Sequence, residues 1–415
     1  MNGQNNSISF ENTAIAFAHK NNGELKKAHF LFSSMGKPWL VNLGLKITPV
    51  AIKLHLPFTK TVIRKTIFQQ FVGGETLEET AKVADKLEEY NVKVILDYGV
   101  EGKDGEENFD HARDEFIKVI NYAATQANIP FISIKVTGFA RFALLEKIDA
   151  VMNAASGTLM KRYLNTIENL AAAEREEWHR VRLRMLHVCE EACKKNIGVL
   201  IDAEETWIQD PVDAVTILMM DTFNKNRAVV FNTLQLYRHD RLQFLKDSYT
   251  AARERNFILG AKLVRGAYMD KERARAAAMN YSSPIQPNKD ACDNDYNEAV
   301  AFCIDHLDKI FVIVASHNEH SNLYTTQLLD KKELPHNHPH VHFSQLYGMS
   351  DNITFNLAKS GCSVSKYLPF GPIKDVIPYL MRRAQENSSV AGQTGRELNL
   401  ITKEIERRSN STIQA

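Results

Sequence analysis

The stretch Ile310-Phe-Val-Ile-Val-Ala-Ser-His-Asn318 shows the pattern that decides the fold. Its first six residues are continuously apolar, as expected for a strand of a parallel sheet that is buried on both faces. Three polar residues follow directly, where such a strand should end. A buried strand that runs into polar residues is typical of α/β proteins, because their functional groups lie in the loops after the strands.

The same pattern recurs along the chain. The other apolar runs span 92–97, 131–136, 198–203, 228–234, 259–264, 341–346 and 363–368. Helix-like segments separate them, for example 110–128, 211–225, 240–255 and 298–309. Eight strands that alternate with helices predict a (β/α)8 TIM-type barrel. An open doubly wound sheet is the alternative, although the chain lacks both G-x-G-x-x-G after its first strand and a P-loop.

The regions outside the regular alternation predict additional helical parts. We predict an N-terminal helical arm at 1–88, a catalytic barrel at 89–390 and a C-terminal tail at 391–415. The connection at about 140–196 is too long for a simple crossover and is rich in Ala, Glu and Arg. We therefore expect extra helices inserted after the second strand.

Composition narrows the class of protein. The chain has 415 residues, of which 44% are hydrophobic and 24% charged, so it can bury a large core. A formal net charge of +1 gives no reason to expect binding of nucleic acid. The five cysteines show no C-x-x-C spacing, which favours buried thiols in a reducing compartment. No apolar run reaches the ~18 residues that a bilayer-spanning helix needs.

One segment of the predicted arm is strongly basic. Between Glu24 and Glu75 there is no acidic residue. The basic residues there are Lys26, Lys27, Lys37, Lys46, Lys53, Lys60, Arg64 and Lys65, and apolar residues lie between them. Segment 26–65 can therefore lie at a membrane interface beside anionic lipid. The alternative is a helical arm that packs on the body with its lysines outward, and both can hold at different surfaces.

Polar residues recur where the predicted strands end. They are Asp97, Glu101, Lys135, Asp202, Glu204, Glu205, Gln235, Lys262, Arg265, Tyr268, Ser316, His317, Asn318 and Tyr367, with Leu346 at the end of the seventh run. In a barrel of this kind the carboxyl ends of the strands form the active-site face. The many cations without an evident nucleophile or metal motif suggest an anionic, phosphate-bearing cofactor that carries the reaction itself.

The segment Tyr367–Asn387 predicts an anion-binding helix. Pro378 can open or tighten a helical turn. Tyr379, Arg382, Arg383 and Glu386 follow at i, i+3, i+4 and i+7, so they share one helix face. Two guanidiniums oriented by a carboxylate suit a small carboxylate ligand, which arginine binds with two donors at once. An ordinary solvated amphipathic helix is the alternative.

Two groups of residues resemble metal ligands without supporting a metal site. His336, His338, His340 and His342 alternate, but prolines mark the segment as a loop and no carboxylate or cysteine accompanies them. Asp202 with its acidic neighbours resembles a magnesium site, but the adjacent strand ends supply no matching carboxylates. We predict no metal.

Four motifs together resemble the proline dehydrogenase family. They are Lys262-Leu-Val-Arg-Gly-Ala-Tyr268, Ala315-Ser-His-Asn318, Ile201-Asp-Ala-Glu-Glu205, and Tyr367-Leu-Pro-Phe-Gly followed by Tyr379-Leu-Met-Arg-Arg-Ala-Gln-Glu-Asn387. The resemblance runs from about Phe10 to Asn387. It implies an FAD-dependent (β/α)8 barrel that oxidises L-proline to Δ1-pyrroline-5-carboxylate and passes the electrons to a membrane quinone. No segment resembles an aldehyde dehydrogenase, so we expect a monofunctional enzyme.

The resemblance assigns expected roles to individual residues. Arg382, Arg383 and Lys135 should bind the proline carboxylate, with Glu386 orienting the second arginine. The other substrate-binding residues are expected to be Asp97, Glu101, Tyr268, Leu346, Tyr367 and Tyr379. The flavin should contact Asp202, Gln235, Lys262, Val264, Gly266, Ala267, Met269, Ser316, His317, Asn318 and Leu346. Of these residues, Lys135, Asp202, Lys262, Arg382 and Arg383 are predicted to be catalytic.

Two positions bear on specificity within the family. Lys262 stands where many bacterial members have an arginine near flavin N5, and a lysine lacks the planar fork of donors. Tyr367 suggests proline as the substrate, since relatives that act on hydroxyproline tend to carry a smaller residue there.

Two expectations concern location and rival functions. No transit peptide is evident at 1–28, so we expect a cytoplasmic protein that is peripheral on the inner face of the cytoplasmic membrane. From the residues alone, two rivals stay open: another barrel enzyme such as a Schiff-base aldolase, and a non-catalytic peripheral membrane adaptor.

Overall fold

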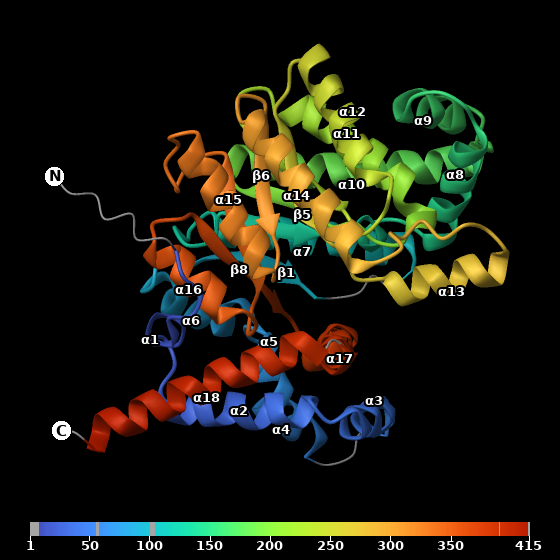
Figure 1. Ribbon diagram of the computed structural model, residues 1–415. Helices are drawn as coiled ribbons and strands as arrows, with labels where there is room; N and C mark the ends of the chain where they lie inside the picture. The colour runs from blue at the N-terminus through green and yellow to red at the C-terminus, as the bar shows by residue number, and fades with distance from the viewer. Residues whose placement is uncertain (1–7, 55–57, 100–103, 390, 414–415) are drawn as a thin grey trace. The chain divides into compact units, whose positions relative to one another are not determined.

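The computed structural model describes residues 8–54, 58–99, 104–389 and 391–413 (Figure 1). Within these residues the strands close into a barrel in the order β1-β2-β3-β4-β5-β6-β7-β8. The strands are β1 Lys93–Tyr98, β2 Phe131–Ile134, β3 Gly198–Ile201, β4 Val230–Gln235, β5 Leu259–Val264, β6 Ile310–Ala315, β7 Val341–Leu346 and β8 Val364–Phe370. Every strand pair with a described register is parallel. The predicted (β/α)8 barrel is confirmed.

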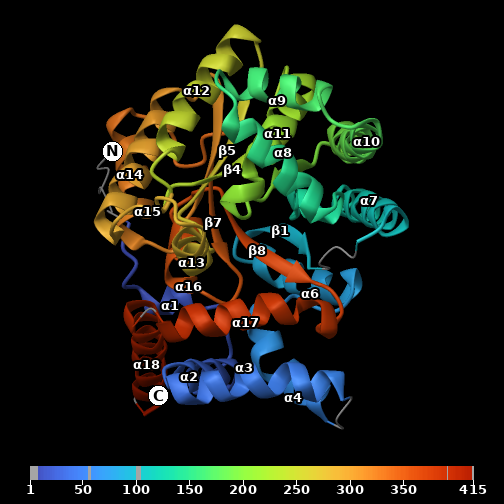
Figure 2. The same cartoon turned by 90° about the vertical axis from the view of Figure 1, so that its right-hand side faces the viewer.

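Helices precede, connect and follow the strands (Figures 1 and 2). The α-helices are α1 Thr13–Ala16, α2 Asn22–Met35, α3 Pro38–Lys53, α4 Thr59–Ile63, α5 Gln69–Phe71, α6 Leu77–Glu88, α7 Glu106–Ala123, α8 Phe142–Ala154, α9 Leu159–Glu168, α10 Ala172–Lys195, α11 Gln209–Phe223, α12 Arg241–Glu254, α13 Met269–Met279, α14 Lys289–Asp305, α15 Glu319–Lys331, α16 Asp351–Lys359, α17 Ile373–Ser389 and α18 Ala391–Ile413. A π-helical turn spans Arg64–Phe68, and 3-10 turns span Val136–Gly138 and Thr206–Ile208.

The strand boundaries follow the predictions closely, with differences where strands meet polar loops. β5, β6 and β7 begin and end at the predicted residues. β2 ends two residues early because the chain turns into the 3-10 turn at Val136–Gly138, where Val136 stays fully buried. Apolar character therefore continues past the end of the ladder, which is why the sequence pattern overestimates the length of this strand.

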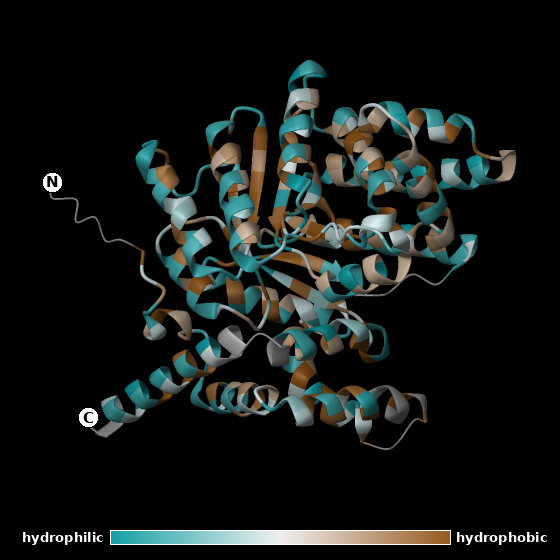
Figure 3. Ribbon diagram, turned by 45° about the vertical axis from the view of Figure 1, so that its right-hand side comes forward, coloured by the Kyte–Doolittle hydropathy of each residue, from teal (hydrophilic) through white to brown (hydrophobic). Residues whose placement is uncertain are grey.

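The chain forms two compact units, and each is described on its own. Unit 2, residues 102–342, holds strands β2 to β6, whose hydrophobic composition is shown in brown in Figure 3. The predicted extra helices after the second strand are α8, α9 and α10. They pack through buried aromatic residues, and the indole nitrogen of Trp178 donates a 2.8 Å hydrogen bond to the hydroxyl of Tyr163.

Unit 1, residues 1–101 and 343–415, combines the N-terminal arm with β1, β8, most of β7 and the C-terminal helices. A capping box at Asn21 and Glu24 starts α2. One hydrophobic cluster joins α2 and α3 to α17 and α18, with Phe32, Phe71 and Leu400 among its fully buried members. The residues predicted as a C-terminal tail form α18, which lies beside α2 (Figures 1 and 2).

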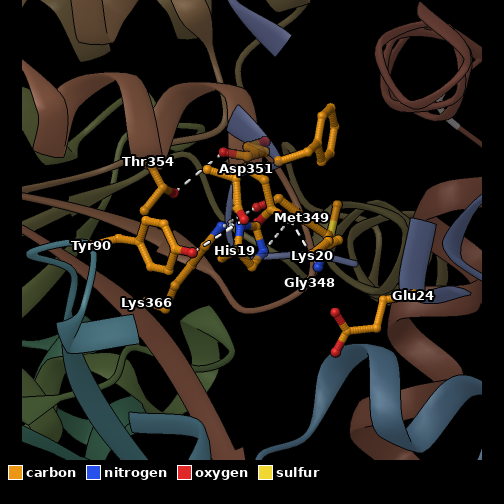
Figure 4. A network of polar contacts seen from close by, with 12 residues as sticks. His19, Lys20, Glu24, Tyr90, Gly348, Met349, Asp351, Thr354 and Lys366 are labelled. Carbon is orange, nitrogen blue, oxygen red and sulfur yellow. Dashed lines mark hydrogen bonds and ion pairs between the residues drawn. The ribbon is translucent and has the colours of Figure 1, made fainter. Parts of the chain in front are cut away.

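A buried ionic cluster ties four segments of unit 1 together (Figure 4). Asp351, the first residue of α16, accepts from Lys366 Nζ of β8 at 2.9 Å and lies 3.3 Å from Lys20 Nζ and 3.4 Å from His19 Nε2. Burial alone would raise the pKa of Asp351, but the two lysines hold it well below its usual range. We call His19, Lys20, Asp351, Lys366 and Glu397 the Asp351 cluster.

Candidate active site

The strand ends of unit 2 carry a lysine–aspartate pair with a second lysine nearby. Lys262 lies on β5 and its Nζ donates to Asp202 Oδ1 at 2.5 Å, just past the end of β3. Lys135 Nζ lies 3.8 Å from the other Asp202 oxygen. Lys262 is only 5% exposed, so its ammonium is shielded from bulk water. A shielded charge interacts strongly with a ligand because the local dielectric constant is low. The structure thus brings together the three predicted catalytic residues of this unit.

A buried amide stands beside this pair. Gln235 is the last residue of β4, and its register partner on β5 is Val264. Lys262 precedes Val264 by two residues, so the side chains of Gln235, Val264 and Lys262 share one face of the sheet. The Gln235 Nε2 group donates to the Glu204 carbonyl at 3.0 Å. Its Oε1 atom is buried and has no hydrogen-bond partner in the described part of the chain. A buried acceptor of this kind is costly unless a ligand donates to it.

The loop after β5 needs a glycine at one position. Gly266 has φ +130°, and a Cβ atom there would lie 2.4 Å from the ring of Tyr237. Gly266, Ala267 and Met269 are exposed, and Tyr268 is half-buried. There is no room for a side chain at Gly266, so the loop after β5 exposes its backbone at this position. Exposed backbone allows a flat ligand to approach closely beside β5, the strand that carries Lys262.

Arg265 organises the polar loop after β6. Its guanidinium donates to Ser316 Oγ at 2.7 Å, to Ser321 Oγ at 2.9 Å and to Asp293 at 2.7 Å. Asn318 caps α15 by accepting from the Ser321 backbone N–H at 3.0 Å, and half-buried His317 lies between these residues. The predicted flavin residues Ser316, His317 and Asn318 are therefore fixed at the start of a helix whose dipole favours anions.

These features fit an anionic aromatic cofactor. The unsatisfied Gln235 oxygen offers an acceptor for an imide N–H, and Lys262 and Lys135 offer positive charge. The bare loop at Gly266 leaves room for a ring system. The residues present in unit 2 are thus compatible with FAD.

The predicted substrate residues on the strands of unit 1 share one face. Leu346 of β7 is the register partner of Tyr367 of β8, and Asp97 of β1 pairs with Pro369. Because side chains alternate along a strand, Leu346, Tyr367 and Asp97 point to the same side, whereas Lys366 points to the other. Asp97 and Tyr367 are buried and Leu346 is half-buried. Glu101 lies outside the described residues.

Helix α17 brings the predicted aromatic, arginine and carboxylate groups together. Arg383 Nη2 donates to Glu386 Oε1 at 2.7 Å, and its guanidinium lies 5.2 Å from the centroid of the Tyr379 ring. Arg383 is buried, while Arg382 and Glu386 are half-buried. The predicted helix face is therefore present, and we call these four residues the arginine cluster. The helix begins at Ile373, so Pro378 lies inside it. Of the two predicted alternatives for Pro378, the one in which it opens the helix is therefore wrong.

Burial sets the ionisation of this cluster. It raises the pKa of Tyr379 to about 12, so the phenol stays protonated. Burial also raises the pKa of Glu386, against the opposite effect of Arg383. The Tyr379 hydroxyl is buried and has no hydrogen-bond partner in the described part of the chain.

The four histidines of segment 336–342 have separate environments. His336 Nε2 lies 2.8 Å from an Asp330 oxygen, and His340 Nδ1 lies 2.6 Å from the Leu307 carbonyl. His342 is buried on β7, and burial lowers its pKa to about 3. Among the described residues no cluster of three potential ligands is placed to hold a metal ion.

One site group was seen in the sequence without being given a role. Glu204 follows Asp202 by two residues, and the hydroxyl of Thr137 lies 2.8 and 3.0 Å from its two carboxylate oxygens. Burial raises the pKa of Glu204 to about 7, with Lys135 opposing the shift. The sequence did contain a usable signal. Thr137 follows β2 and Glu204 follows the adjacent strand β3, and polar residues that follow adjacent strands of a barrel are expected to lie close together.

The closed barrel with polar groups at its strand ends defines the class of a (β/α)8 barrel enzyme. The family model described as proline dehydrogenase matches residues 80–396. The chain belongs to the proline dehydrogenase family and is an oxidoreductase of that family.

Individual relatives agree with this assignment. The chain is 29% identical to proline dehydrogenase 1, mitochondrial, of Caenorhabditis elegans over 97% of this chain and 89% of the relative. It is 28% identical to the hydroxyproline dehydrogenase of Xenopus laevis over 97% of this chain and 90% of the relative. The crystal structure of proline utilization A (PutA) from Bdellovibrio bacteriovorus, inactivated by N-propargylglycine, matches 91% of this chain with a TM-score of 0.69 at 20% identity. This chain spans 38% of that PutA chain, and the likeness shows the shared fold.

Proposed function

We propose that the protein oxidises L-proline to Δ1-pyrroline-5-carboxylate with FAD as the hydride acceptor. The observation that carries this proposal is the arginine cluster of α17. In it the buried guanidinium of Arg383 is oriented by Glu386 and lies near the ring of Tyr379. This arrangement suits a small amino-acid carboxylate, because a guanidinium binds it with two parallel donors. Family membership supplies the reaction.

In this proposal the residues of unit 1 hold and orient the substrate. Arg382 and Arg383 bind the carboxylate, and Tyr367, Tyr379 and Leu346 surround the ring. Fixing both ends of proline limits it to orientations in which the carbon beside its nitrogen can react, which is how positioning lowers a barrier.

The residues of unit 2 hold the cofactor in this proposal. Lys262, Asp202 and Gln235 contact the ring system, and Ser316, His317 and Asn318 lie at the α15 N-terminus, which favours the phosphates. When bound, FAD supplies the acceptor for a hydride. Proline must lose its ammonium proton before it can react. The positive charges of Arg382 and Arg383 favour the neutral amine of the bound proline.

The proposal extends to the electron acceptor and the location. We propose a membrane quinone as acceptor and peripheral attachment through the basic segment 26–65 on the cytoplasmic face of the membrane. The absence of acidic residues between Glu24 and Glu75 supports this, since it favours contact with anionic lipid. No helix in the described ranges has the length and hydropathy needed to cross a bilayer.

A Schiff-base aldolase is less well supported by the site. Its catalytic lysine must be a neutral amine to attack a carbonyl. Lys262 Nζ is instead held by Asp202 at 2.5 Å, so it is engaged with a carboxylate of its own chain.

Anaerobic flavin reduction tests the proposal directly. The purified protein should be yellow, and its flavin absorbance should bleach when L-proline is added without oxygen. The same preparation mixed with L-alanine should stay yellow, because alanine has no ring for the tyrosines to enclose. A colourless protein that fails to bind added FAD, or a flavoprotein that proline leaves oxidised, would exclude the proposed reaction.

A further inference from the structure

Helix α13 of unit 2 begins at the end of the loop after β5 and buries very little apolar surface. Of its eleven residues only Glu272 and Ala276 are buried. These two residues are one helical turn apart, so they form the inner face of the helix. An ordinary surface helix packs through a stripe of large apolar side chains. Helix α13 presents a carboxylate and a methyl group instead, so polar contacts must hold it in place.

The carboxylate of Glu272 makes a double contact with a single residue, Thr206. Glu272 is fully buried. The backbone N–H of Thr206 donates to Glu272 Oε1 at 2.8 Å, and the hydroxyl of Thr206 donates to Glu272 Oε2 at 2.6 Å. A buried carboxylate is costly unless such donors satisfy it, and two donors at fixed positions accept only one alignment of the carboxylate. The contact therefore fixes α13 relative to Thr206.

Two further contacts join α13 to the residues on either side of Thr206. Lys271 forms an ion pair with Glu205. The guanidinium of Arg275 lies 4.2 Å from the centroid of the Trp207 ring, a distance at which a cation is attracted to an aromatic face. Helix α13 is thus docked along the loop that follows β3.

The main chain of Glu272 also holds the loop after β5. Its backbone N–H donates to the carbonyl of Tyr268 at 2.9 Å. At the start of the same loop, the backbone N–H of Tyr237 donates to the carbonyl of Arg265 at 2.7 Å. The backbone of 266–268 is therefore held at one end by the residue that follows β4 and at the other end by Glu272.

We propose that Glu272 is a positioning residue that fixes the backbone of 266–269 relative to the loop that carries Asp202, and that this spacing sets how tightly FAD is held. Asp202 precedes Thr206 by four residues, so the Glu272–Thr206 contact joins the two loops. The inference deepens the proposed function and rests on it, because both loops carry residues proposed to contact the flavin. Glu272 and Thr206 are not among those residues, so they act on FAD through the two loops.

Equilibrium dialysis of the full-length flavoprotein tests the inference. The fluorescence of the released FAD gives the Kd for the cofactor in the wild type and in each variant. The variants are Glu272→Ala, Thr206→Val, the double variant of these two, and Glu272→Gln. The matched control is Arg273→Ala, which removes an exposed side chain from the same turn of α13. Circular dichroism establishes that each variant is folded.

The Kd for FAD should rise about tenfold or more in Glu272→Ala, because the variant loses two hydrogen bonds to a charged group. Thr206→Val loses one of the two and should raise the Kd about threefold. The double variant should bind FAD no more weakly than Glu272→Ala, because both changes remove the same contact.

Two variants separate the positioning role from a general loss of structure or charge. Glu272→Gln should keep the Kd for FAD within about threefold of the wild type, since an amide can accept from the Thr206 N–H and donate to the Thr206 hydroxyl. Arg273→Ala should leave the Kd unchanged. The KM for proline of Glu272→Ala, measured with excess FAD, should change less than about twofold, because unit 1 holds the substrate in the proposed function.

Three outcomes would overturn the inference. They are an unchanged Kd for FAD in Glu272→Ala, losses that add up in the double variant, and a loss in Arg273→Ala as large as that in Glu272→Ala. Should Glu272→Ala not fold, an unchanged Kd in Thr206→Val would overturn the inference in the same way. Reduction by L-proline reports on the proposed function separately. If the wild-type flavin stays oxidised with proline while the Kd follows Glu272, the reaction is wrong and the positioning role stands.

Discussion

Unit 1 contains two clusters of buried charges that differ in their access to solvent. In the Asp351 cluster, the side chains of Lys366, Asp351 and Lys20 are 1%, 6% and 14% exposed. In the arginine cluster, the side chain of Arg383 is 8% exposed but that of its partner Glu386 is 37% exposed. The first cluster is closed on all sides, and the second opens toward solvent at one side.

This difference separates a structural use of charge from a ligand-binding use. The carboxylate of Asp351 is surrounded by cations of its own chain, so it holds the arm, α16 and β8 together. The arginine cluster keeps a partly exposed carboxylate and an aromatic hydroxyl without a partner in the described residues, as a binding site does before its ligand arrives. Removal of a charge should therefore affect stability in the first cluster and activity in the second.

The largest effect is expected for the double variant Arg382→Met, Arg383→Met. It should lose about 10³–10⁴-fold in kcat/KM for proline, since each charge-assisted contact contributes ~1.5–3 kcal/mol. Bound flavin, read from the visible spectrum, should remain. Arg382→Lys with Arg383→Lys keeps the charge without the fork and should recover part of the loss. Wild-type turnover in the methionine variant would remove the arginine cluster from the proposed site.

Asp351→Asn should reduce the free energy of unfolding by about 3–4 kcal/mol, because it leaves Lys20 and Lys366 buried without their shared carboxylate. The matched change in the other cluster, Glu386→Gln, should cost under about 1 kcal/mol, because Glu386 is partly exposed. Urea unfolding followed by circular dichroism measures both. Equal losses would mean that the two clusters do not differ in the way proposed.

The Asp351 cluster should also give stability a dependence on pH through Glu397. Burial, and then the charge of Asp351, raise the pKa of Glu397 from its ordinary 4.5 to about 7. Between these values the folded state binds the proton and the unfolded state does not, so the contribution of Glu397 to stability falls as pH rises from about 5 to 8. His19 acts in the opposite direction, because burial lowers its pKa from 6.5 to about 4 and the unfolded state alone then binds a proton between these values. The Glu397 contribution is therefore isolated by comparing a Glu397 variant with the wild type.

Glu397→Gln removes this titration and keeps an acceptor for the Ser350 backbone N–H. Relative to wild type, the variant should gain about 2 kcal/mol of stability between pH 5 and pH 8. Thermal or urea unfolding at both pH values measures the difference. Parallel curves for the two proteins would show that Glu397 is ionised in the folded state at neutral pH.

The smallest effect is expected at Tyr367. Tyr367→Ser should lower the preference for proline over hydroxyproline by about tenfold, because removal of the ring leaves space for the extra hydroxyl. The ratio of the two kcat/KM values is the measurement, with Tyr379→Phe as a control that keeps the aromatic volume. An unchanged ratio in Tyr367→Ser would remove the proposed role of this tyrosine in specificity.

The sequence predicted the barrel and the arginine cluster because both depend on short-range patterns. Eight apolar runs give strands, and positions i, i+3, i+4 and i+7 give a helix face. The Asp351 cluster was not predicted, since Lys20, Asp351, Lys366 and Glu397 come from four distant segments. Each of them alone resembles a surface charge.

Helix α18 was missed for a different reason. Its segment, 391–415, was assigned as a tail, although Leu398, Ile401 and Ile405 follow one another at helical spacing. Leu400 and Ile401 are fully buried in the hydrophobic cluster of unit 1. Here the periodic signal was present, and the position at the end of the chain led to its neglect.

Lys366 and Tyr367 are adjacent residues of β8 whose side chains point to opposite faces of the strand, so the alignment of β8 is specified on both faces. Lys366 points toward Asp351, and Tyr367 points to the opposite side with Leu346. Deleting a single residue upstream within β8 would exchange their directions, which would take the ammonium of Lys366 away from Asp351 and bring a phenol to Asp351 in its place. A barrel in which β8 is shifted by one residue therefore loses favourable contacts on both faces of this strand. Both losses raise the free energy of the shifted barrel, so folding favours the correct alignment.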